Sequence, residues 1–535
     1  MKKILSFIVA FLAMGCITFA QPSRPKLVVG IVIDQMRWDY LYRYQARYGE
    51  GGFKRLLNEG FSCENTRLPY IPSVTAIGHT CIYTGSVPSI HGIAGNNFMK
   101  DGQVAYCTDD ASVKPVGSDS KAGLMSPRNL WVNTVGDELR IATNDRSKVI
   151  GIALKDRASI LPAGHNPNGA FWFDDKSGNF ITSTYYMNKL PKWVDSFNKE
   201  KLPAKYLSQK WSTLYPIDTY KESTSDNSPY ENGIRKDVKA VLPLDLPALY
   251  RKYGYDIIRS TPFGCNLTFD LAKAAIEGEQ LGGRGETDFL AVSCSSPDYI
   301  GHQVGTHAVE TEDTYLRLDK SLEDFFSYLD QKVGKGNYLV FLSADHGAMN
   351  NAQYLIDRRI PAGAWNEKKV QQTLNDALKV KYPSAGNLVK AVFNYQVFFD
   401  TQKIDSLKLD YSAIKEQAVE LLKKDPDVLY ACDQEKASIS SIPEDIKYRI
   451  INGYNRERSG GVQIITKPGF YDGGLKGTTH GMWNPYDTHI PLVFMGWGIK
   501  HGACTKEVHM TDIAPTIAAL LHIQAPDGCI GQPIF

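Results

Sequence analysis

Residues 26–34 read KLVVGIVID, and residues 338–346 read YLVFLSADH. Each stretch is an unbroken run of large apolar residues that leads into an aspartate. Continuous rather than alternating hydrophobicity is typical of strands buried on both faces, as in a parallel sheet covered by helices. Similar apolar runs lie at 149–154, 289–293 and 490–495. The sequence therefore predicts an α/β fold with a central, mostly parallel sheet, whose functional groups collect at the carboxyl ends of the strands.

Helical patterns separate these strands, at about 311–329 and, at the end of the chain, at 511–521 with Thr511 as the expected N-cap. Two stretches interrupt the alternation. Residues 159–285 are rich in Tyr, Trp, Pro, Lys and Ser without a clear period, and residues 351–475 combine a helical segment with strand-like runs. We interpret both stretches as insertions that cap the carboxyl edge of the sheet.

The first residues have the pattern of a secretory signal peptide. Met1-Lys2-Lys3 precedes an apolar run over residues 4–13, and Thr18-Phe19-Ala20 offers small residues before a cut at Gln21. The expected organisation is thus a signal peptide over residues 1–20 and one domain over residues 21–535.

A lipoprotein site at Cys16 is an alternative to this cleavage. It is less favoured, because Ala rather than Leu stands three residues before the cysteine. Either way we expect an exported, periplasmic protein. No later stretch reaches the roughly 18 apolar residues of a membrane helix, so none is expected after removal of the signal.

The composition is that of an ordinary globular protein. Hydrophobic residues make up 43% of the chain and charged residues 22%, with 60 basic against 58 acidic side chains. A disordered chain would be less apolar and more strongly charged, and a nucleic-acid binder usually has a basic excess, so the sequence favours neither. The eight cysteines after Cys16 form no CxxC pair or zinc-finger spacing. We treat them as structural, with their disulfide pairing open.

Six Asp and His residues follow predicted strands or lie in glycine-flanked loops. They are Asp34, Asp298, His302, Asp345, His346 and His480. Asp298 and His302 are four residues apart, so that one helical turn would point both to the same side. Any one of these residues is more often a helix cap or a structural side chain. Together they favour a metal site, because mixed His and carboxylate ligands are typical of catalytic zinc, and six ligands divide into two such sites.

A second group of residues is suited to hold a phosphate. The segment PSVTAIGH at 72–79 predicts a loop that opens a helix, with Thr75 near its start, where backbone N–H groups favour an anion. Taken alone, Thr75 is more simply a helix N-cap. Asn96 lies in a glycine-rich turn, and Lys155 and Arg157 follow a buried strand, where they can bind phosphoryl oxygens rather than form a solvated surface pair.

Together these residues resemble the alkaline phosphatase superfamily and, more narrowly, the PafA-type (phosphate-irrepressible) alkaline phosphatases that Gram-negative bacteria export. The resemblance extends from Asp34 to His480 and implies an alkaline phosphatase-like fold and an exported, zinc-dependent phosphomonoesterase that acts on small phosphate monoesters. It implies two Zn²⁺ ions, one held by Asp298, His302 and His480 and the other by Asp34, Asp345 and His346. It also implies Thr75 as the nucleophile, with a phosphothreonine intermediate, and Asn96, Lys155 and Arg157 as ligands of the nonbridging phosphoryl oxygens.

Other branches of the superfamily fit less well. The segment 69–75 lacks the downstream Arg of the sulfatase motif, and cofactor-independent phosphoglycerate mutases use a serine and are cytosolic. Nucleotide pyrophosphatase/phosphodiesterases share the threonine, the asparagine and both metal sites, so they stay the main alternative. Lys155 and Arg157 favour a monoester, since two cations suit its dianionic end. A non-catalytic exported binding protein is a remote alternative, because all six ligands and Thr75 are present.

Overall fold

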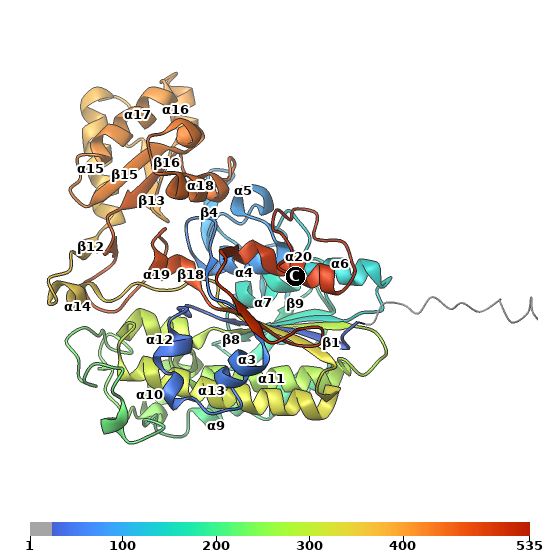
Figure 1. Cartoon of the computed structure of the whole chain (residues 1–535). Coiled ribbons are helices and arrows are strands. Elements are labelled where there is room, and N and C mark those ends of the chain that lie inside the picture. Colours follow the sequence, from blue (N-terminus) through green and yellow to red (C-terminus); the bar gives the residue numbers. More distant parts are fainter. Residues whose placement is uncertain (1–23) are drawn as a thin grey trace, which may run out of the picture.

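A computed structural model describes residues 24–535 (Figure 1). The predicted signal peptide over residues 1–20 and the alternative site at Cys16 lie outside the described residues. Within the described part of the chain, no helix is both long and apolar enough to cross a membrane.

A ten-stranded sheet forms the centre of the molecule, in the order β20-β2-β19-β11-β1-β10-β7-β8-β9-β6. Its outer strands include β20 (Gly502–Cys504), β2 (Phe61–Cys63) and β6 (Pro115–Val116). Its middle five strands are parallel to one another. They are β11 (Tyr338–Ser343), β1 (Leu27–Ile33), β10 (Asp288–Cys294), β7 (Val149–Ala153) and β8 (Gly169–Asp174), and all their residues are buried. The prediction of a central, mostly parallel sheet of buried strands is confirmed.

The apolar run at 490–495 differs from the other four. It is split at Pro491 into β18 (His489–Ile490), which joins a separate three-stranded sheet, and β19 (Leu492–Gly496), which pairs antiparallel with β11. Proline has no N–H for a sheet ladder and commonly ends a strand. Because β19 runs in the opposite direction, its carboxyl end lies at the other edge of the sheet from those of the five parallel strands.

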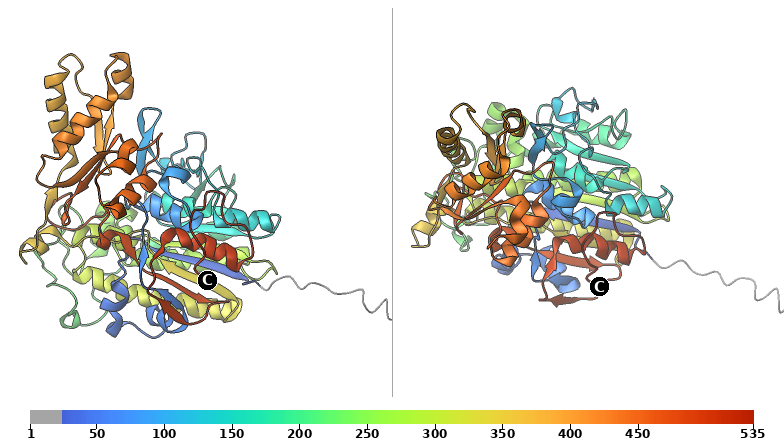
Figure 2. Two further views of the ribbon diagram at one scale, coloured as in Figure 1. Left: turned by 45° about the horizontal axis from the view of Figure 1, so that its top comes forward. Right: turned by 90° about the horizontal axis from the view of Figure 1, so that it is seen from above.

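Helices cover both faces of the sheet (Figures 1 and 2). One layer contains α4 (Thr75–Thr84), α6 (Val135–Ala142), α7 (Asp156–Ala163) and α20 (Ile513–Leu520). The other contains α3 (Phe53–Glu59), α11 (Phe263–Glu279) and α13 (Val309–Leu329). The helix expected at 311–329 is therefore present as α13. Thr511 is not the N-cap of the closing helix, because it lies in a 3₁₀ turn over Met510–Asp512 that precedes α20.

The first of the two expected insertions, residues 159–285, is partly built into the core. It contributes β8 and β9 (Asn179–Ser183) to the central sheet, and α11 packs on β10. The strands β8 and β9 are short, and loops and short helices separate them from α11, so no single period extends over the stretch.

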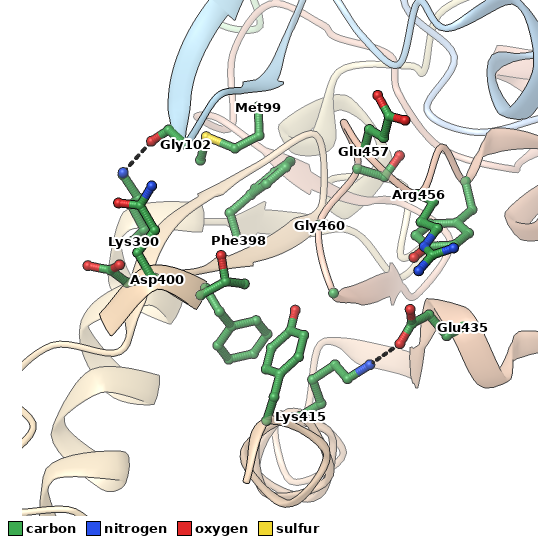
Figure 3. Close-up of a pocket in the computed structure, with 17 residues that line it drawn as sticks. Met99, Gly102, Lys390, Phe398, Asp400, Lys415, Glu435, Arg456, Glu457 and Gly460 are labelled. Carbon is green, nitrogen blue, oxygen red and sulfur yellow. Dashed lines mark hydrogen bonds and ion pairs between the residues drawn. The ribbon is translucent and has the colours of Figure 1, made fainter. Parts of the chain in front are cut away.

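The second stretch, residues 351–475, forms a smaller unit with its own core, at the top of Figure 1. Its antiparallel sheet has the order β13-β14-β16-β15, with strands at Val389–Phe393, Gln396–Phe399, Val462–Thr466 and Val428–Asp433. Helices α15 (Glu367–Lys381), α17 (Tyr411–Leu422) and α18 (Glu444–Gly453) flank this sheet. A polar cavity of about 240 Å³ is lined by residues of this unit and of the hairpin of β4 (Asn97–Lys100) and β5 (Gln103–Tyr106), among them Met99, Lys390 and Lys415 (Figure 3).

Candidate active site

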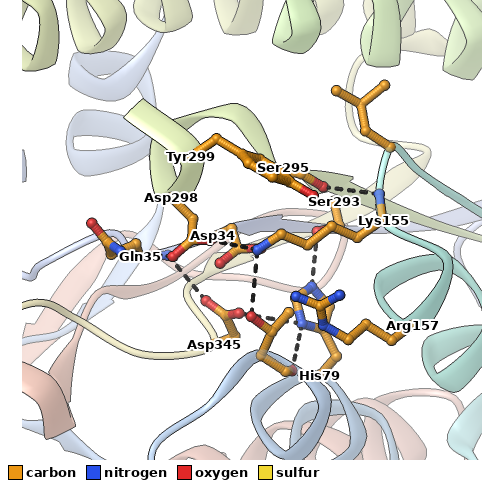
Figure 4. Close-up of polar contacts among 12 residues, drawn as sticks. Asp34, Gln35, His79, Lys155, Arg157, Ser293, Ser295, Asp298, Tyr299 and Asp345 are labelled. Atoms are coloured by element: carbon orange, nitrogen blue, oxygen red, sulfur yellow. Dashed lines mark hydrogen bonds and ion pairs between the residues drawn. The ribbon is translucent and has the colours of Figure 1, made fainter. Parts of the chain in front are cut away.

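The predicted site residues gather at the carboxyl ends of β1, β10, β11 and β7 (Figure 4). Asp34 follows β1, Asp345 and His346 follow β11, and Lys155 caps α7 after β7. Asp298 and His302 lie on α12 (Ser296–Val304), which follows β10, so their predicted helical spacing is present. His480 lies on the loop before α19 (Pro485–Thr488). These residues lie close together because the carboxyl ends of parallel strands share one edge of the sheet.

We name Asp34, Asp298, His302, Asp345, His346 and His480 the Asp/His cluster. Possible ligand atoms of Asp34, Asp345 and His346 lie within 4.8 Å of one another, and so do those of Asp298, His346 and His480. His302 Nε2 lies 3.1 Å from Asp298 Oδ1. The structure therefore brings all six residues together, with His346 between the two groups.

The three imidazoles of the cluster are oriented by main-chain carbonyls. Nδ1 of His302 donates to Thr478 O at 2.9 Å, Nδ1 of His346 to Gly347 O at 3.0 Å, and Nδ1 of His480 to Ser73 O at 2.6 Å. Each Nε2 is then left with a lone pair, which is the arrangement of histidines that ligate metals.

Lone pairs and negative charge face one another inside the cluster. His346 Nε2 lies 3.6 Å from Asp34 Oδ1 and 3.3 Å from Asp345 Oδ2, and neither oxygen has a hydrogen-bond donor among the described residues. Both aspartates are fully buried. Burial and the neighbouring Asp34 hold the pKa of Asp345 well above its ordinary value, and burial likewise raises the pKa of Asp34. Such a donor set fits divalent cations, which would relieve this repulsion.

Lys155 supplies the one ammonium that the structure places inside the cluster. Its Nζ lies 2.5 Å from Asp34 Oδ2 and 2.6 Å from Asp298 Oδ2, and the side chain is buried. Burial opposes the charge, but Asp298 and Asp34 raise the pKa of Lys155 above its ordinary value. Lys155 is therefore a permanent cation at the junction of the two ligand groups.

Thr75 is the first residue of α4, as predicted, and all ten residues of this helix are buried. Its Oγ1 lies 3.5 Å from His346 Nε2 and 3.4 Å from Lys155 Nζ. Asn96 accepts a hydrogen bond from Ala76 N at 2.9 Å, which attaches its turn to the same helix end. The hydroxyl thus faces the Asp/His cluster from a helix N-terminus, where an anion is favoured.

Helix α4 lies against the backbone of Asp345 at Gly78. A Cβ on Gly78 would stand 2.3 Å from Asp345 O and 2.6 Å from Asp345 Cβ, distances that would force the helix and the strand end apart.

We predict that Gly78→Ala lowers both the melting temperature and the metal content of the purified protein. Thermal denaturation and elemental analysis measure the two effects. Gly474→Ala is the control, because nothing lies within 4 Å of its Cβ. Normal metal content in Gly78→Ala would contradict this account of the close approach.

Sequence reasoning missed two residues that support the site. Gln35 donates to Asp298 Oδ1 through Nε2 at 2.6 Å and to Asp345 Oδ1 through its main-chain N–H at 3.1 Å. Tyr106, at the end of β5, accepts a hydrogen bond from Arg157 Nη1 at 2.9 Å. The position of Gln35 directly after a strand-end aspartate was a usable signal. No local pattern links Tyr106 to Arg157, which is 51 residues away.

The class of the protein follows from the fold, the site and a family comparison. The sequence profile of the type I phosphodiesterase / nucleotide pyrophosphatase family matches residues 28–487. The chain belongs to this family, and with it to the alkaline phosphatase superfamily.

Within the superfamily, the chain groups with the PafA and PhoV alkaline phosphatases. Over its whole length it is 53% identical to alkaline phosphatase PafA of Elizabethkingia meningoseptica, covering 98% of that protein. It is 54% identical over 96% of its length to alkaline phosphatase PhoV of Synechococcus elongatus, covering 92% of it. A Myroides odoratus protein named calcium-transporting ATPase is 52% identical, with 100% and 98% coverage. The crystal structure of wild-type PafA superposes with a TM-score of 0.93, at 53% identity and with 96% and 98% of the two chains covered. The resemblance on which the sequence analysis relied is confirmed.

Proposed function

We propose that this protein is a zinc-dependent alkaline phosphatase that hydrolyses small phosphate monoesters through a phosphothreonine intermediate on Thr75. The observation that carries the proposal is the position of the Thr75 hydroxyl, at a helix N-terminus and within 3.5 Å of the two residues His346 and Lys155. The identity to PafA and PhoV over nearly the whole chain supports phosphatase activity.

In this proposal the Asp/His cluster holds two Zn²⁺ ions: Asp298, His302 and His480 hold the first, and Asp34, Asp345 and His346 hold the second. When bound, such ions lower the pKa of a neighbouring hydroxyl and offset the charge on a departing oxygen.

The chain's own groups then define the reaction. Thr75 Oγ1 loses its proton and attacks phosphorus, the bond from phosphorus to the ester oxygen breaks, and the ester oxygen takes up a proton and leaves as the alcohol. Water then breaks the bond between phosphorus and Thr75 Oγ1, which releases inorganic phosphate and returns the proton to the hydroxyl. Asn96, Lys155 and Arg157 bind the nonbridging oxygens, whose negative charge persists in the transition state. Arg157 is oriented for this by Tyr106, whose hydroxyl donates in turn to Asp156 Oδ1 at 2.7 Å.

Phosphodiester hydrolysis is the second candidate, since the matching family profile carries that name. The two cations Lys155 and Arg157 favour the monoester, because its phosphoryl group carries one more negative charge than that of a diester. We expect kcat/KM of the zinc-loaded protein to be higher for p-nitrophenyl phosphate than for methyl p-nitrophenyl phosphate, which has the same leaving group. A preference for the diester would place the protein with the phosphodiesterases instead.

Removal of metal is expected to inactivate the enzyme. Without the ions, Thr75 would lose its activation, and no positive charge would offset that of the departing oxygen. We predict that dialysis against EDTA abolishes p-nitrophenyl phosphate hydrolysis and that stoichiometric Zn²⁺ restores it. Elemental analysis should find two zinc ions per active chain. Activity that survives complete removal of zinc would overturn the metal assignment.

We also infer that the protein is exported to the periplasm with cleavage before Gln21. Residues 351–475, with those loops of residues 159–285 that lie outside the central sheet, are proposed to limit access to the site. The basic start and apolar run of residues 1–13 support export. Amino-terminal sequencing of the mature protein tests the cleavage. A chain that begins with a lipid-modified Cys16 would favour the alternative.

A further inference from the structure

The smaller unit reaches the active site through a two-residue turn. Strands β13 and β14 pair up to Phe393 and Gln396, so that only Asn394 and Tyr395 lie between them. Both of these residues have positive φ angles, of 55° and 56°. Two positive φ angles are typical of a type I′ hairpin turn, where asparagine is readily accepted but a bulky side chain is strained. Strained positions persist only where the surrounding structure holds them, and they are frequent at functional sites.

Tyr395 is held in this conformation by the core of the smaller unit. It is 4% exposed, its main-chain N–H donates to Glu367 Oε1 at 2.8 Å, and its hydroxyl accepts a hydrogen bond from Asp472 N at 3.0 Å. Its ring stacks on that of Trp365, with 5.6 Å between the ring centroids. The turn therefore has a fixed position, and so has the neighbouring Asn394.

Asn394 lies against the turn that carries Asn96. Its Nδ2 donates to Asn97 O at 3.0 Å. A Cβ on Gly95 would stand 2.4 Å from the same nitrogen, so the side chain of Asn394 occupies the space that a side chain at this position would need. The amide of Asn394 thus contacts the residues on both sides of Asn96.

The oxygen and the main chain of Asn96 are engaged in other contacts. Its Oδ1 accepts a hydrogen bond from Ala76 N at 2.9 Å, and its main-chain O accepts one from Cys107 N at 3.0 Å. Within residues 24–535, Asn96 Nδ2 donates to no other group, which leaves it for a nonbridging phosphoryl oxygen. The direction of this nitrogen depends on how the turn is held.

A second contact of the smaller unit with this hairpin lies farther from Asn96. Lys390 Nζ donates to Gly102 O, in the loop between β4 and β5 (Figure 3). Asn97, by contrast, directly follows Asn96 and is the first residue of β4. A change at Asn394 therefore acts on the phosphate-binding end of the hairpin, whereas a change at Lys390 acts on the opposite end.

We propose that Asn394 is a positioning residue for phosphoryl binding, through which the smaller unit keeps Asn96 Nδ2 directed at a nonbridging oxygen of the substrate. This inference rests on the proposed function of Asn96. It gives residues 351–475 a part in building the phosphate site, in addition to limiting access to it. A neutral hydrogen bond typically changes an equilibrium constant by about 2- to 10-fold, so the contribution of this contact is moderate.

A double-mutant cycle on the full-length, zinc-loaded protein tests the proposal. Asn394→Gly removes the amide and suits the positive φ. We expect it to lower kcat/KM for p-nitrophenyl phosphate about 5-fold and to raise the Kd of inorganic phosphate, measured by calorimetry, by the same factor, with zinc content unchanged. In an Asn96→Ala background the same substitution should have no further effect on either quantity, because Asn394 acts through Asn96. Asn394→Asp keeps the shape but loses the donor, and should be impaired at least as much.

Two variants serve as controls and should keep wild-type values. Asn144→Gly makes the same substitution at an exposed position with a φ of 51°, and Lys390→Ala removes the contact at the opposite end of the hairpin. A loss in Lys390→Ala as large as that in Asn394→Gly would attribute the effect to loosening of the whole hairpin and would overturn the proposal.

Equal losses from Asn394→Gly in the wild-type and Asn96→Ala backgrounds would mean a general structural role and would likewise overturn the proposal. So would an Asn394→Gly enzyme with normal kcat/KM and normal phosphate affinity. Failure of the proposed function has a different signature, because the wild-type protein itself would then neither hydrolyse the monoester nor bind phosphate.

Discussion

Replacing Thr75 with alanine is expected to abolish hydrolysis of p-nitrophenyl phosphate while two zinc ions stay bound. Thr75 Oγ1 is the hydroxyl that faces the Asp/His cluster, at 3.5 Å from His346 Nε2, and no bond to the phosphoryl group can form without it. Loss of a nucleophile typically lowers kcat by roughly 10³-fold or more. Steady-state kinetics and elemental analysis of the same preparation measure both effects.

The control for this substitution is Thr84→Ala, in the same buried helix. Thr84 donates to Thr80 O at 2.7 Å, as an internal threonine of a helix commonly does, and it has no contact with the Asp/His cluster. Thr84→Ala should keep normal kcat. A Thr75→Ala enzyme with a normal rate would remove the nucleophile assignment, whereas loss of zinc from it would show that Thr75 mainly holds the metal site together.

The double variant Lys155→Ala, Arg157→Ala is expected to show the second largest effect, a fall of about 10³-fold in kcat/KM for the monoester. Each charge-assisted hydrogen bond contributes roughly 1.5–3 kcal/mol, so the loss of two corresponds to between two and four orders of magnitude. The loss should be smaller for methyl p-nitrophenyl phosphate, which carries less negative charge. Zinc should stay bound, because the metal ions themselves offset the charges of Asp34 and Asp298.

Lys176→Ala with Arg128→Ala is the matched control, since it removes the same two charges from exposed positions. This variant should behave as the wild type. If the Lys155/Arg157 variant lost kcat/KM equally for the monoester and the diester, the two cations would not distinguish the two substrates. The choice of a monoesterase would then rest on the relatives alone.

The central strands could be predicted from the sequence because a strand that is buried on both faces consists of consecutive apolar residues. Both neighbours of β1 in the sheet, β10 and β11, are parallel to it and buried along their whole length, so each appears as an apolar run. The direction of β19 could not be predicted, since an apolar run looks the same in a parallel and an antiparallel strand. Only the partners of β19 in the folded chain decide its direction.

The clustering of the Asp and His residues could be predicted because Asp34, Asp345 and His346 follow strand ends, and because Asp298 and His302 sit at helical spacing. What could not be predicted is how they are held. The carbonyls of Ser73, Gly347 and Thr478 orient the imidazoles, and a main-chain oxygen is present in every residue, so no residue type marks it.

The close approach at Gly78 has a mechanical consequence. Since α4 rests on the main chain of Asp345 without an intervening side chain, Thr75 and the end of β11 form a single rigid body. His79 reinforces it, with Nδ1 donating to Thr75 O at 2.9 Å and Nε2 in contact with Ser293 Oγ on β10 at 2.8 Å. Thermal motion of the outer loops and of the smaller unit can therefore change the entrance for the substrate while the separation of nucleophile and ligands stays constant.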